Sequence, residues 1–223
     1  NIRESDDIYE VFANFFDLYD GEESLKKYDP ALRHTVKTMV LGCGYGVGPK
    51  KFADISGMSE AEAEEAVKLY REQMFKVVGY WNRLGRSLAD VHALDEEYFI
   101  KLPSGRRLNY GLLKSHPRTG GRDYFAEIVK NSARRPVKLY GGMLAENASQ
   151  ALARDIFADA MIRMFDRGMD IICHVHDEVI IEANKDESDK VLADAIEIMK
   201  TPPEWIPDIP LDAEGKVLTR YEK

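Results

Sequence analysis

The stretch Ile171-Ile172-Cys173-His174-Val175-His176-Asp177-Glu178-Val179-Ile180-Ile181 decides the fold near the carboxyl end of the chain. Apolar, mostly β-branched residues on both sides of His176-Asp177-Glu178 predict two short strands, over 170–175 and 179–183, joined by a tight hairpin. The tip of that hairpin would project Asp177, and a carboxylate there indicates metal chemistry because hard cations prefer oxygen ligands. The alternative is an ordinary solvated turn, since Asp is common in turns.

A second pattern lies far upstream, where Arg33, Lys37, Leu41 and Tyr45 follow one another at four-residue steps and Gly46 comes next. Four-residue steps stay on one face of a helix, so two cations, an apolar side chain and a phenol form a stripe. The cations suit phosphate oxygens, and Leu41 offers an apolar wall for a sugar and a base, so the stripe fits a nucleoside triphosphate. The alternative is an ordinary amphipathic helix with exposed Arg and Lys.

The remaining pattern predicts a mixture of helices and hairpins. We expect a first helix capped by Asp6 or Asp7 and a long helix that starts at the capping box Ser59-Glu60-Ala61-Glu62 and runs past Val78. Further on, we expect a hairpin over 98–112 turned by Pro103-Ser104-Gly105, a helix over 147–165 and a last helix near 188–200. Trp81 is expected to serve packing rather than ligand stacking.

The composition limits the classes of protein to which the chain can belong. The chain has 223 residues, 44% of them hydrophobic, and a formal net charge of −8, which suits a globular unit with a sizeable core. No apolar stretch is long enough for a membrane span, so we expect no membrane contact and a cytoplasmic protein. Cys43 and Cys173 lack metal-type spacing and are expected to be buried thiols without a disulfide.

One segment of the chain, called the basic belt below, is basic although the chain as a whole is acidic. From Lys101 to Lys138 there are ten Lys or Arg residues and two acids, Asp123 and Glu127, which gives +8. Together with Tyr110, Tyr124 and several glycines, this composition suits backbone contact with a nucleic acid duplex or single strand. For any one residue in the belt, a plain solvated loop is an equally good interpretation.

Taken together, the motifs resemble those of family A DNA polymerases. Arg33-xxx-Lys37-xxx-Leu41-xxx-Tyr45-Gly46 looks like motif B of that family, and Val175-His176-Asp177-Glu178 looks like motif C. Ser104-Gly105-Arg106-Arg107-Leu108 and the segment from Glu146 to Asp155 also resemble segments of its bacteriophage members. The four motifs occur in one order, and the resemblance extends over nearly the whole chain.

The resemblance implies an α+β fold that is mostly helical and belongs to a right-hand polymerase. Residues 1–136 would form the fingers, with the motif B helix at about 30–46. Residues 137–223 would form the carboxyl-terminal part of the palm, an antiparallel hairpin at about 170–183 with packed helices. The implied activity is template-directed DNA synthesis, in which a primer 3′ hydroxyl attacks a dNTP with the help of two Mg²⁺ ions.

Roles follow from the resemblance, residue by residue. Asp177 and Glu178 would be metal ligands and catalytic carboxylates, with Glu178 the weaker candidate. Arg33 and Lys37 would bind the triphosphate of the dNTP, Lys37 also as a catalytic proton donor, and Leu41 and Tyr45 would complete the dNTP site. Template-primer contacts would come from Tyr45, Gly46, Gln150 and His176, although a His176 that simply packs the hairpin is nearly as good an interpretation.

Two departures from the family pattern bear on these roles. Most bacterial members carry Phe or Tyr where this chain has Leu41, so we expect altered discrimination against dideoxynucleotides. The spacing from Asn147 to Gln150 is one residue shorter than in the bacterial enzymes, so no role is carried over to Asn147.

The motif A aspartate, which supplies the other metal-ligand set in the family, lies upstream of the segment that begins at Asn1. We therefore expect either a fragment or a chain completed by a partner that carries motif A, the thumb and any proofreading exonuclease. DNA template-primer and dNTP are the other implied partners.

Two other classes of function fit parts of the sequence. His174-Val175-His176-Asp177 could belong to a metallohydrolase site, because histidines at i and i+2 on a strand share a face and zinc favours imidazole. That pattern is broken, because the aspartate follows His176 at once and no later histidine exists in the chain. The other alternative is a noncatalytic nucleic-acid-binding or assembly subunit of a split polymerase.

Overall fold

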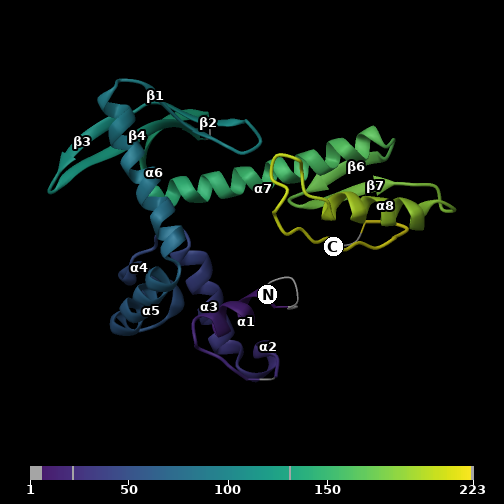
Figure 1. The fold of residues 1–223 in the computed structure, drawn as a ribbon, viewed down its shortest axis with the longest axis horizontal. Helices are drawn as coiled ribbons and strands as arrows, with labels where there is room; N and C mark the ends of the chain where they lie inside the picture. The colour runs from purple at the N-terminus through teal and green to yellow at the C-terminus, as the bar shows by residue number, and fades with distance from the viewer. Residues whose placement is uncertain (1–6, 22, 131, 222–223) are drawn as a thin grey trace. The chain divides into compact units, whose positions relative to one another are not determined.

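The computed structural model describes residues 7–21, 23–130 and 132–221 and shows a mixture of helices and paired strands (Figure 1). The helices are α1 (Ile8–Phe15), α2 (Leu25–Tyr28), α3 (Pro30–Cys43), α4 (Pro49–Ser56), α5 (Glu60–Gln73), α6 (Phe75–Ala93), α7 (Gly141–Asp166) and α8 (Ser188–Lys200). The strands are β1 (Glu97–Lys101), β2 (Arg107–Leu112), β3 (Lys114–Arg118), β4 (Gly121–Lys130), β5 (Ala133–Leu139), β6 (Asp170–Val175) and β7 (Glu178–Glu182). The α+β prediction is confirmed. Within these ranges, no helix has the length and apolar character that a membrane crossing requires.

The chain divides into two compact units. The first comprises Asn1–Ile100 and Asn109–Asn147, and the second comprises Lys101–Leu108 and Ala148–Lys223. The predicted boundary at 136/137 falls inside β5, and the division into fingers and palm stays a prediction.

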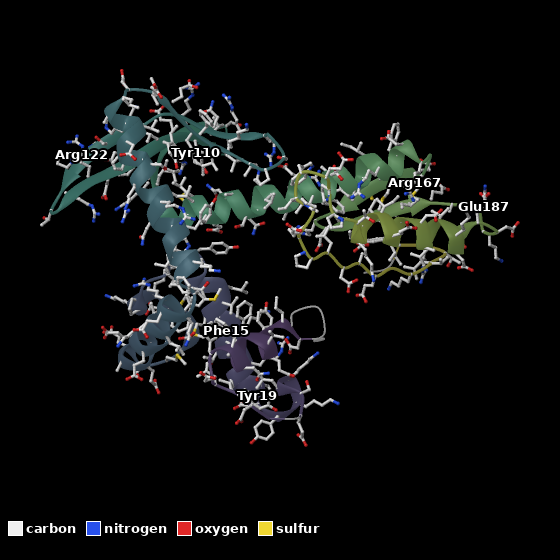
Figure 2. All side chains as sticks on the ribbon, in the orientation of Figure 1. Phe15, Tyr19, Tyr110, Arg122, Arg167 and Glu187 are labelled. Carbon is white, nitrogen blue, oxygen red and sulfur yellow. The ribbon has the colours of Figure 1, made fainter. Side chains whose placement is uncertain are left out.

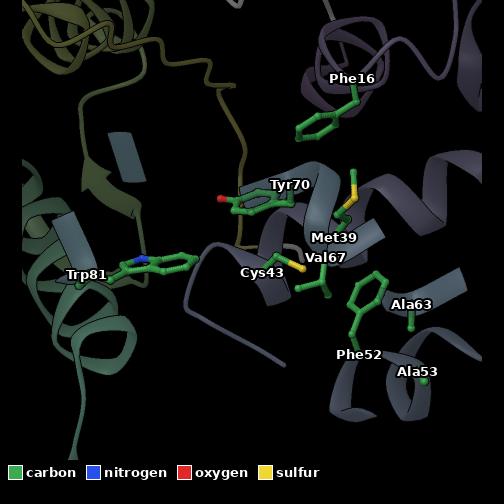
Figure 3. Close-up of a cluster of buried hydrophobic side chains, with 10 residues drawn as sticks. Phe16, Met39, Cys43, Phe52, Ala53, Ala63, Val67, Tyr70 and Trp81 are labelled. Carbon is green, nitrogen blue, oxygen red and sulfur yellow. The ribbon is translucent and has the colours of Figure 1, made fainter. Parts of the chain in front are cut away.

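The first unit is built around one large apolar cluster (Figure 3). Its buried members are Phe16, Met39, Cys43, Phe52, Ala53, Ala63, Val67, Tyr70, Trp81 and Ala145. They come from α3, α4, α5, α6, the start of α7 and the residue after α1, so this one cluster joins six segments. Trp81 packs in the cluster, as expected, and its indole N–H donates a hydrogen bond to the Gly44 carbonyl oxygen at 3.0 Å.

Helix starts in this unit follow the predicted capping residues. Asp7 caps α1 by accepting a hydrogen bond from the Tyr9 N–H, and Asp6 lies outside the described residues. Ser59 and Glu62 form the predicted capping box at the start of α5. Each cap supplies acceptors for N–H groups that the first helical turn leaves without a partner.

The long helix predicted from Ser59 past Val78 is wrong in one respect, because the chain forms two helices that break at Met74. Met74 has φ −95° and ψ 37°, outside the helical region; its N–H closes α5 on Tyr70, and its carbonyl oxygen accepts from Val77 and Val78. The break carries no Gly or Pro, and the apolar periodicity continues through it because both helices pack against the same cluster.

Strands β3, β4 and β5 form an antiparallel sheet over 114–139, beyond the predicted hairpin at 98–112, where no strands were predicted. Two features of the sequence explain why this sheet was not predicted. Charged residues interrupt the apolar alternation, and Pro117 and Pro136 argue against central strands. Pro117 lies on β3 and Pro136 on β5, the two edge strands of the sheet, where proline is tolerated because part of the backbone N–H groups points away from the sheet.

The second unit carries the predicted hairpin, formed by β6 and β7, which confirms that element of the prediction. Its apolar side packs on α7 and α8 through a cluster of Ala160, Met164, Ala195 and Ile198, joined by Met169, Ile171, Val179, Ile181 and Met199. The register shifts between Ile171 and Cys173, which face Ile181 and Ile180, so Ile172 is an extra residue that forms a bulge.

The bulge reverses which side chains of β6 face the helices. Without it, Cys173 would share the face of Ile171 and be buried, as predicted. With it, His174 lies opposite Val179 on the side of the hairpin that faces α7, and Cys173 is exposed. The expectation of a buried Cys173 is therefore wrong, whereas Cys43 is buried and neither cysteine is in a disulfide.

The turn between β1 and β2 contains Pro103-Ser104-Gly105, as predicted, and is anchored to α7 within the second unit. The Asp155 carboxylate accepts hydrogen bonds from Ser104 Oγ at 2.5 Å and Arg106 Nε at 2.7 Å. Arg106 also donates to the Ala151 carbonyl oxygen at 2.9 Å. A largely buried carboxylate with two donors fixes this turn more firmly than an exposed ion pair would.

A close backbone contact at the start of α7 leads to a testable prediction about the stability of the first unit. A Cβ added at Gly142 would lie 2.2 Å from the Tyr45 carbonyl oxygen, which is backbone and cannot rotate away. We expect Gly142→Ala to lower the free energy of unfolding by about 1–3 kcal/mol, because the two segments must separate. Urea unfolding followed by circular dichroism measures this change.

Gly79 in α6 provides the control. A Cβ there meets only the far end of the Arg83 side chain, at 3.6 Å, so Gly79→Ala should leave stability unchanged or raise it by up to about 1 kcal/mol. Equal destabilisation by both substitutions would contradict the importance of the contact at Gly142.

Candidate active site

The predicted cation stripe lies on α3 in the first unit. Arg33, Lys37 and Leu41 follow the helix at four-residue steps, and the Leu41 side chain is 51% exposed. Tyr45 lies in the turn just after the helix, where the Tyr45 N–H donates to the Gly42 carbonyl oxygen. The helix therefore presents two cations and an apolar side chain, and the phenol belongs to the turn.

The cations of the stripe are held by α1, a contact that the sequence did not reveal. Arg33 Nε donates to the Asp7 carboxylate at 2.5 Å, and Arg33 Nη2 donates to the other oxygen at 3.2 Å. The guanidinium lies 5.1 Å and the Lys37 ammonium 5.8 Å from the centre of the Tyr9 ring. Bidentate pairing and ring contact restrict the Arg33 side chain to one orientation.

This ion pair shifts both partners toward their charged forms. The hydrogen bond from Arg33 lowers the pKa of the Asp7 carboxyl, and burial opposes it. The hydrogen bond to Asp7 raises the pKa of Arg33. Since the Asp7 side chain is only 13% exposed and that of Arg33 26%, solvent screens this pair less than a typical surface ion pair.

The turn after α3 is clamped by two other helices. Trp81 of α6 donates to the Gly44 carbonyl oxygen, and Gly142 at the start of α7 touches the Tyr45 carbonyl group. Gly46 has φ 84°, a conformation that a side chain strongly disfavours. The turn that contains Tyr45 and Gly46 is thus held by the hydrogen bond from the Trp81 side chain and by the close approach of the Gly142 backbone.

The predicted catalytic carboxylates lie at the tip of the β6–β7 hairpin in the second unit. Val175 pairs with Glu178, so His176 and Asp177 form a two-residue turn. All three residues of His176-Asp177-Glu178 are exposed, and the His176 backbone has φ 56°. A non-glycine residue in the left-handed region costs about 1–2 kcal/mol, and such strain clusters at functional sites.

A second set of side chains lies behind this tip, on the side of the hairpin that faces α7. His174 Nε2 is 3.2 Å from Arg154 Nη2, and its ring meets Phe157 edge-on at a centroid distance of 5.9 Å. The Arg154 guanidinium also lies 5.7 Å from the centre of the Phe157 ring. Gln150 is exposed on α7, one helical turn before Arg154. Sequence reasoning missed the pairing of Arg154 with His174, because only the bulge at Ile172 turns His174 toward α7.

The donor set at the hairpin tip fits part of a Mg²⁺ site. Asp177 and Glu178 supply hard carboxylate oxygens, and neither carboxylate enters a hydrogen bond or ion pair with any other described residue. In the same ranges, no group of three or more His, Cys, Asp or Glu side chains could hold a metal ion. Mg²⁺ is often bound by one or two carboxylates, with substrate phosphates and water completing its shell. Two exposed adjacent carboxylates fit that role, whereas the zinc cluster of a metallohydrolase is not found among the described side chains.

The structure thus groups the predicted residues into two sets. Arg33, Lys37, Leu41, Tyr45 and Gly46 lie together in the first unit. The second unit holds Gln150, His176, Asp177 and Glu178. The first set lies on and just after α3, and the second lies on α7 and at the tip of the β6–β7 hairpin.

The comparison of the whole chain with known families identifies the class. The sequence model of DNA polymerase family A matches residues 1–223, and the chain belongs to that family. This membership confirms the resemblance drawn from the motifs.

Individual relatives agree with the family assignment. The chain is 33% identical over 225 residues to a DNA polymerase of Bacillus phage SP02, covering 90% of this chain and 34% of that protein. It is 30% identical to the thermostable DNA polymerase I of Thermus thermophilus, covering 83% of this chain and 20% of that protein. Among solved structures, the POL domain of Pol1 from M. smegmatis, in complex with DNA primer-template and dNTP, matches with a TM-score of 0.62 and 25% identity, covering 92% of this chain and 32% of that chain. The chain thus spans about a third or less of the length of these relatives.

The ion pair on the cation stripe generates a pH-dependent prediction. Because the pKa of Asp7 is lower in the folded state than its ordinary value of 3.8, its charge stabilises the fold above pH 3.8, and this stabilisation is lost as pH falls below 3.8. Asp7→Asn retains the capping ability but not the charge, so we expect about 1–2 kcal/mol lower unfolding free energy at pH 7. The gap between the two proteins should close as the pH falls below 3.8.

Thermal unfolding of both proteins between pH 7 and pH 3 measures that gap. Asp54→Asn in α4 is the matched control, since Asp54 is exposed and forms no ion pair within the described ranges. A gap for Asp7→Asn that is as large at pH 3 as at pH 7 would show that the charge of Asp7 is not what matters.

Proposed function

We propose that this chain supplies the dNTP-binding helix and one catalytic carboxylate hairpin of a template-directed DNA polymerase. The observation that carries the proposal is the combination of family membership over residues 1–223 with two intact constellations, the cation stripe on α3 and the exposed carboxylates on the β6–β7 hairpin. The reaction is the attack of a primer 3′ hydroxyl on the α-phosphate of a dNTP, with pyrophosphate leaving.

Asp177 is the principal metal ligand in this proposal, and Glu178 is the second. Their exposure at a strained two-residue turn leaves both carboxylates open to a cation and to substrate phosphates. When bound, Mg²⁺ would lower the pKa of the attacking hydroxyl and neutralise charge on the leaving group. The packing of Val179 and Ile181 on α7 and α8 holds the hairpin that presents the carboxylates.

Arg33 and Lys37 bind the triphosphate. Lys37 is exposed, and the Tyr9 ring orients it without neutralising it, so it can reach a phosphate oxygen and give a proton to the leaving pyrophosphate. Arg33 is already oriented by Asp7, so less side-chain entropy is lost when it meets a phosphate. Because Asp7 occupies part of the guanidinium, Arg33 would share its donors between the carboxylate and the nucleotide.

The remaining residues would select and align the nucleic acid. Leu41 gives an exposed apolar surface for the sugar and base of the dNTP, and Tyr45 and Gly46 form a rigid turn at the template base. Gln150, exposed on α7, and His176, exposed at the hairpin tip, would contact the template-primer. The exposure of His176 favours this role over packing of the hairpin.

A segment or partner chain that carries the motif A aspartate would complete the metal-ligand set, and the thumb and any exonuclease would come with it. The proposal implies a cytoplasmic location, where the DNA template and dNTPs are available.

Primer extension tests the proposal. The chain is assayed with a 5′-labelled primer on a longer template, dNTPs and Mg²⁺, alone and together with a segment that carries the family's motif A aspartate. We expect extension in the complemented mixture, and we expect Asp177→Asn to slow it by on the order of 100-fold, because a carboxylate ligand of the catalytic metal is lost.

Glu182→Gln is the matched control, since Glu182 is an exposed carboxylate on the same hairpin, at the far end of β7. It should extend primers at the rate of the unchanged chain. DNA binding without extension in the complemented mixture would refute the polymerase assignment and favour a noncatalytic nucleic-acid-binding subunit.

A further inference from the structure

We propose that Arg154 and His174 are positioning residues, which hold β6 against α7 so that Asp177 meets its metal ion in the productive orientation. This inference rests on the proposed function, because it takes Asp177 as a metal ligand of the polymerase reaction. It gives a role to a pair of side chains that the proposed reaction does not use.

The two strands that lead to the hairpin tip are supported separately. A two-stranded hairpin is at best marginally stable without packing, and the bulge at Ile172 interrupts this one. The apolar cluster on α7 and α8 includes Val179 of β7, but on β6 it includes Ile171, which precedes the bulge. Beyond the bulge, Cys173 is exposed and His174 contacts α7. His174 therefore supports the part of β6 that continues to the tip.

His174, Arg154 and Phe157 form three mutual contacts. The His174 Nε2 atom lies 3.2 Å from Arg154 Nη2. A guanidinium has no acceptor, so Arg154 donates this hydrogen bond and the imidazole carries its proton on Nδ1. The His174 ring meets the Phe157 ring edge-on at a centroid distance of 5.9 Å, and the Arg154 guanidinium lies 5.7 Å from the centre of the same ring. Phe157 is only 8% exposed, so one buried ring of α7 supports both partners.

This pair lies close enough to the tip to control where the carboxylates point. His174 precedes Asp177 by three residues and lies opposite Val179, the neighbour of Glu178. Val175, which follows His174, is paired with Glu178, so a shift of His174 is passed along the backbone to both carboxylates. A displacement of about 1 Å can cost about 100-fold in rate, and the loss of a partner that orients a metal ligand typically costs about 10–100-fold.

The alternative is that Arg154 and His174 bind a DNA phosphate directly, since both side chains are exposed. Their contact with each other favours positioning. The His174 ring is uncharged in this contact, because a proton on Nε2 would remove the acceptor that Arg154 uses. A phosphate site would instead gain from two separate cations.

Primer extension by the complemented mixture tests the inference with two substitutions of one residue. His174→Gln retains an acceptor for Arg154, whereas His174→Phe retains a ring against Phe157 but has no acceptor. We expect His174→Phe to lower the extension rate at saturating dNTP about tenfold, with the KM for dNTP and the Kd for primer-template unchanged. His174→Gln should stay within about twofold of the unchanged chain. Arg154→Ala should match His174→Phe, and the double variant should be no slower than either, because both residues act through one contact.

Arg163→Ala is the matched control. Arg163 also lies on α7, one helical turn before Arg167, which Figure 2 labels just after that helix. It donates to Asp159 and to the Thr201 carbonyl oxygen, each at 2.8 Å, so it joins α7 to the end of α8 and not to the hairpin. It should lower the temperature of thermal unfolding and leave the extension rate unchanged.

Three results would overturn the inference. The first is equal rates for His174→Phe and His174→Gln. The second is a loss of rate that Arg163→Ala reproduces, since the effect would then be one of stability. The third is a weaker Kd for primer-template with an unchanged rate at saturating substrates, which would show that the pair binds DNA. If the unchanged chain does not extend primers in the complemented mixture, the proposed function itself is refuted, and this inference with it.

Discussion

The contact of the first turn of α7 with the end of α3 is the constraint on which the first unit depends. Gly142 can approach the Tyr45 carbonyl group, and Gly141 can approach the backbone of Trp81, only because neither carries a side chain. Trp81 completes the arrangement with its hydrogen bond to Gly44. The turn at 44–46 is therefore held both by backbone contacts at the two glycines and by the Trp81 side chain, so the cation stripe before it keeps a defined position relative to Tyr45.

The chain is acidic overall, but some of its cations are gathered at defined places. Arg33 and Lys37 are oriented by Asp7 and Tyr9, residues of the first described turn of the chain. The arginines of the β3–β4 hairpin and of α5 and α6 gather around a single cavity. The formal net charge of −8 thus coexists with two local groups of cations, those of α3 and the arginines around the cavity. The positions of the cations, rather than the net charge of the chain, decide whether a surface can bind phosphate.

The sequence predicted those elements whose signals are local. The capping residues Asp7 and Ser59, the helix with the cation stripe and the β6–β7 hairpin were all predicted close to where they form, because capping residues and apolar periodicity act over a few positions. The break at Met74 was missed because the periodicity continues through it. The three-stranded sheet was missed because its edge strands carry proline and charge. The bulge at Ile172 was not predicted either, and because it reverses which side chains of β6 face the helices, the positions of Cys173 and His174 were missed as well.

In the candidate site, too, local features were predicted and long-range contacts were not. The residue types and spacing of Arg33, Lys37, Leu41 and Tyr45, and of His176-Asp177-Glu178, could be identified from sequence because family motifs are local. The partners that orient them could not, since Asp7 lies 26 positions from Arg33 and Arg154 lies 20 positions from His174. Such pairs form only when the tertiary structure brings distant helices and strands together.

In the proposed reaction the cation stripe and the hairpin carboxylates serve the same nucleotide, and a double-mutant cycle distinguishes this from separate roles. Mg²⁺-dependent dNTP binding would be measured for the extension-competent assembly with Lys37→Ala, with Asp177→Asn and with both. We expect a coupling energy of about 1 kcal/mol or more, because the proposal has both residues act on one Mg²⁺-bound triphosphate. Effects that add to within about 0.5 kcal/mol would show that the two sets of residues serve separate ligands, and would refute their proposed common role.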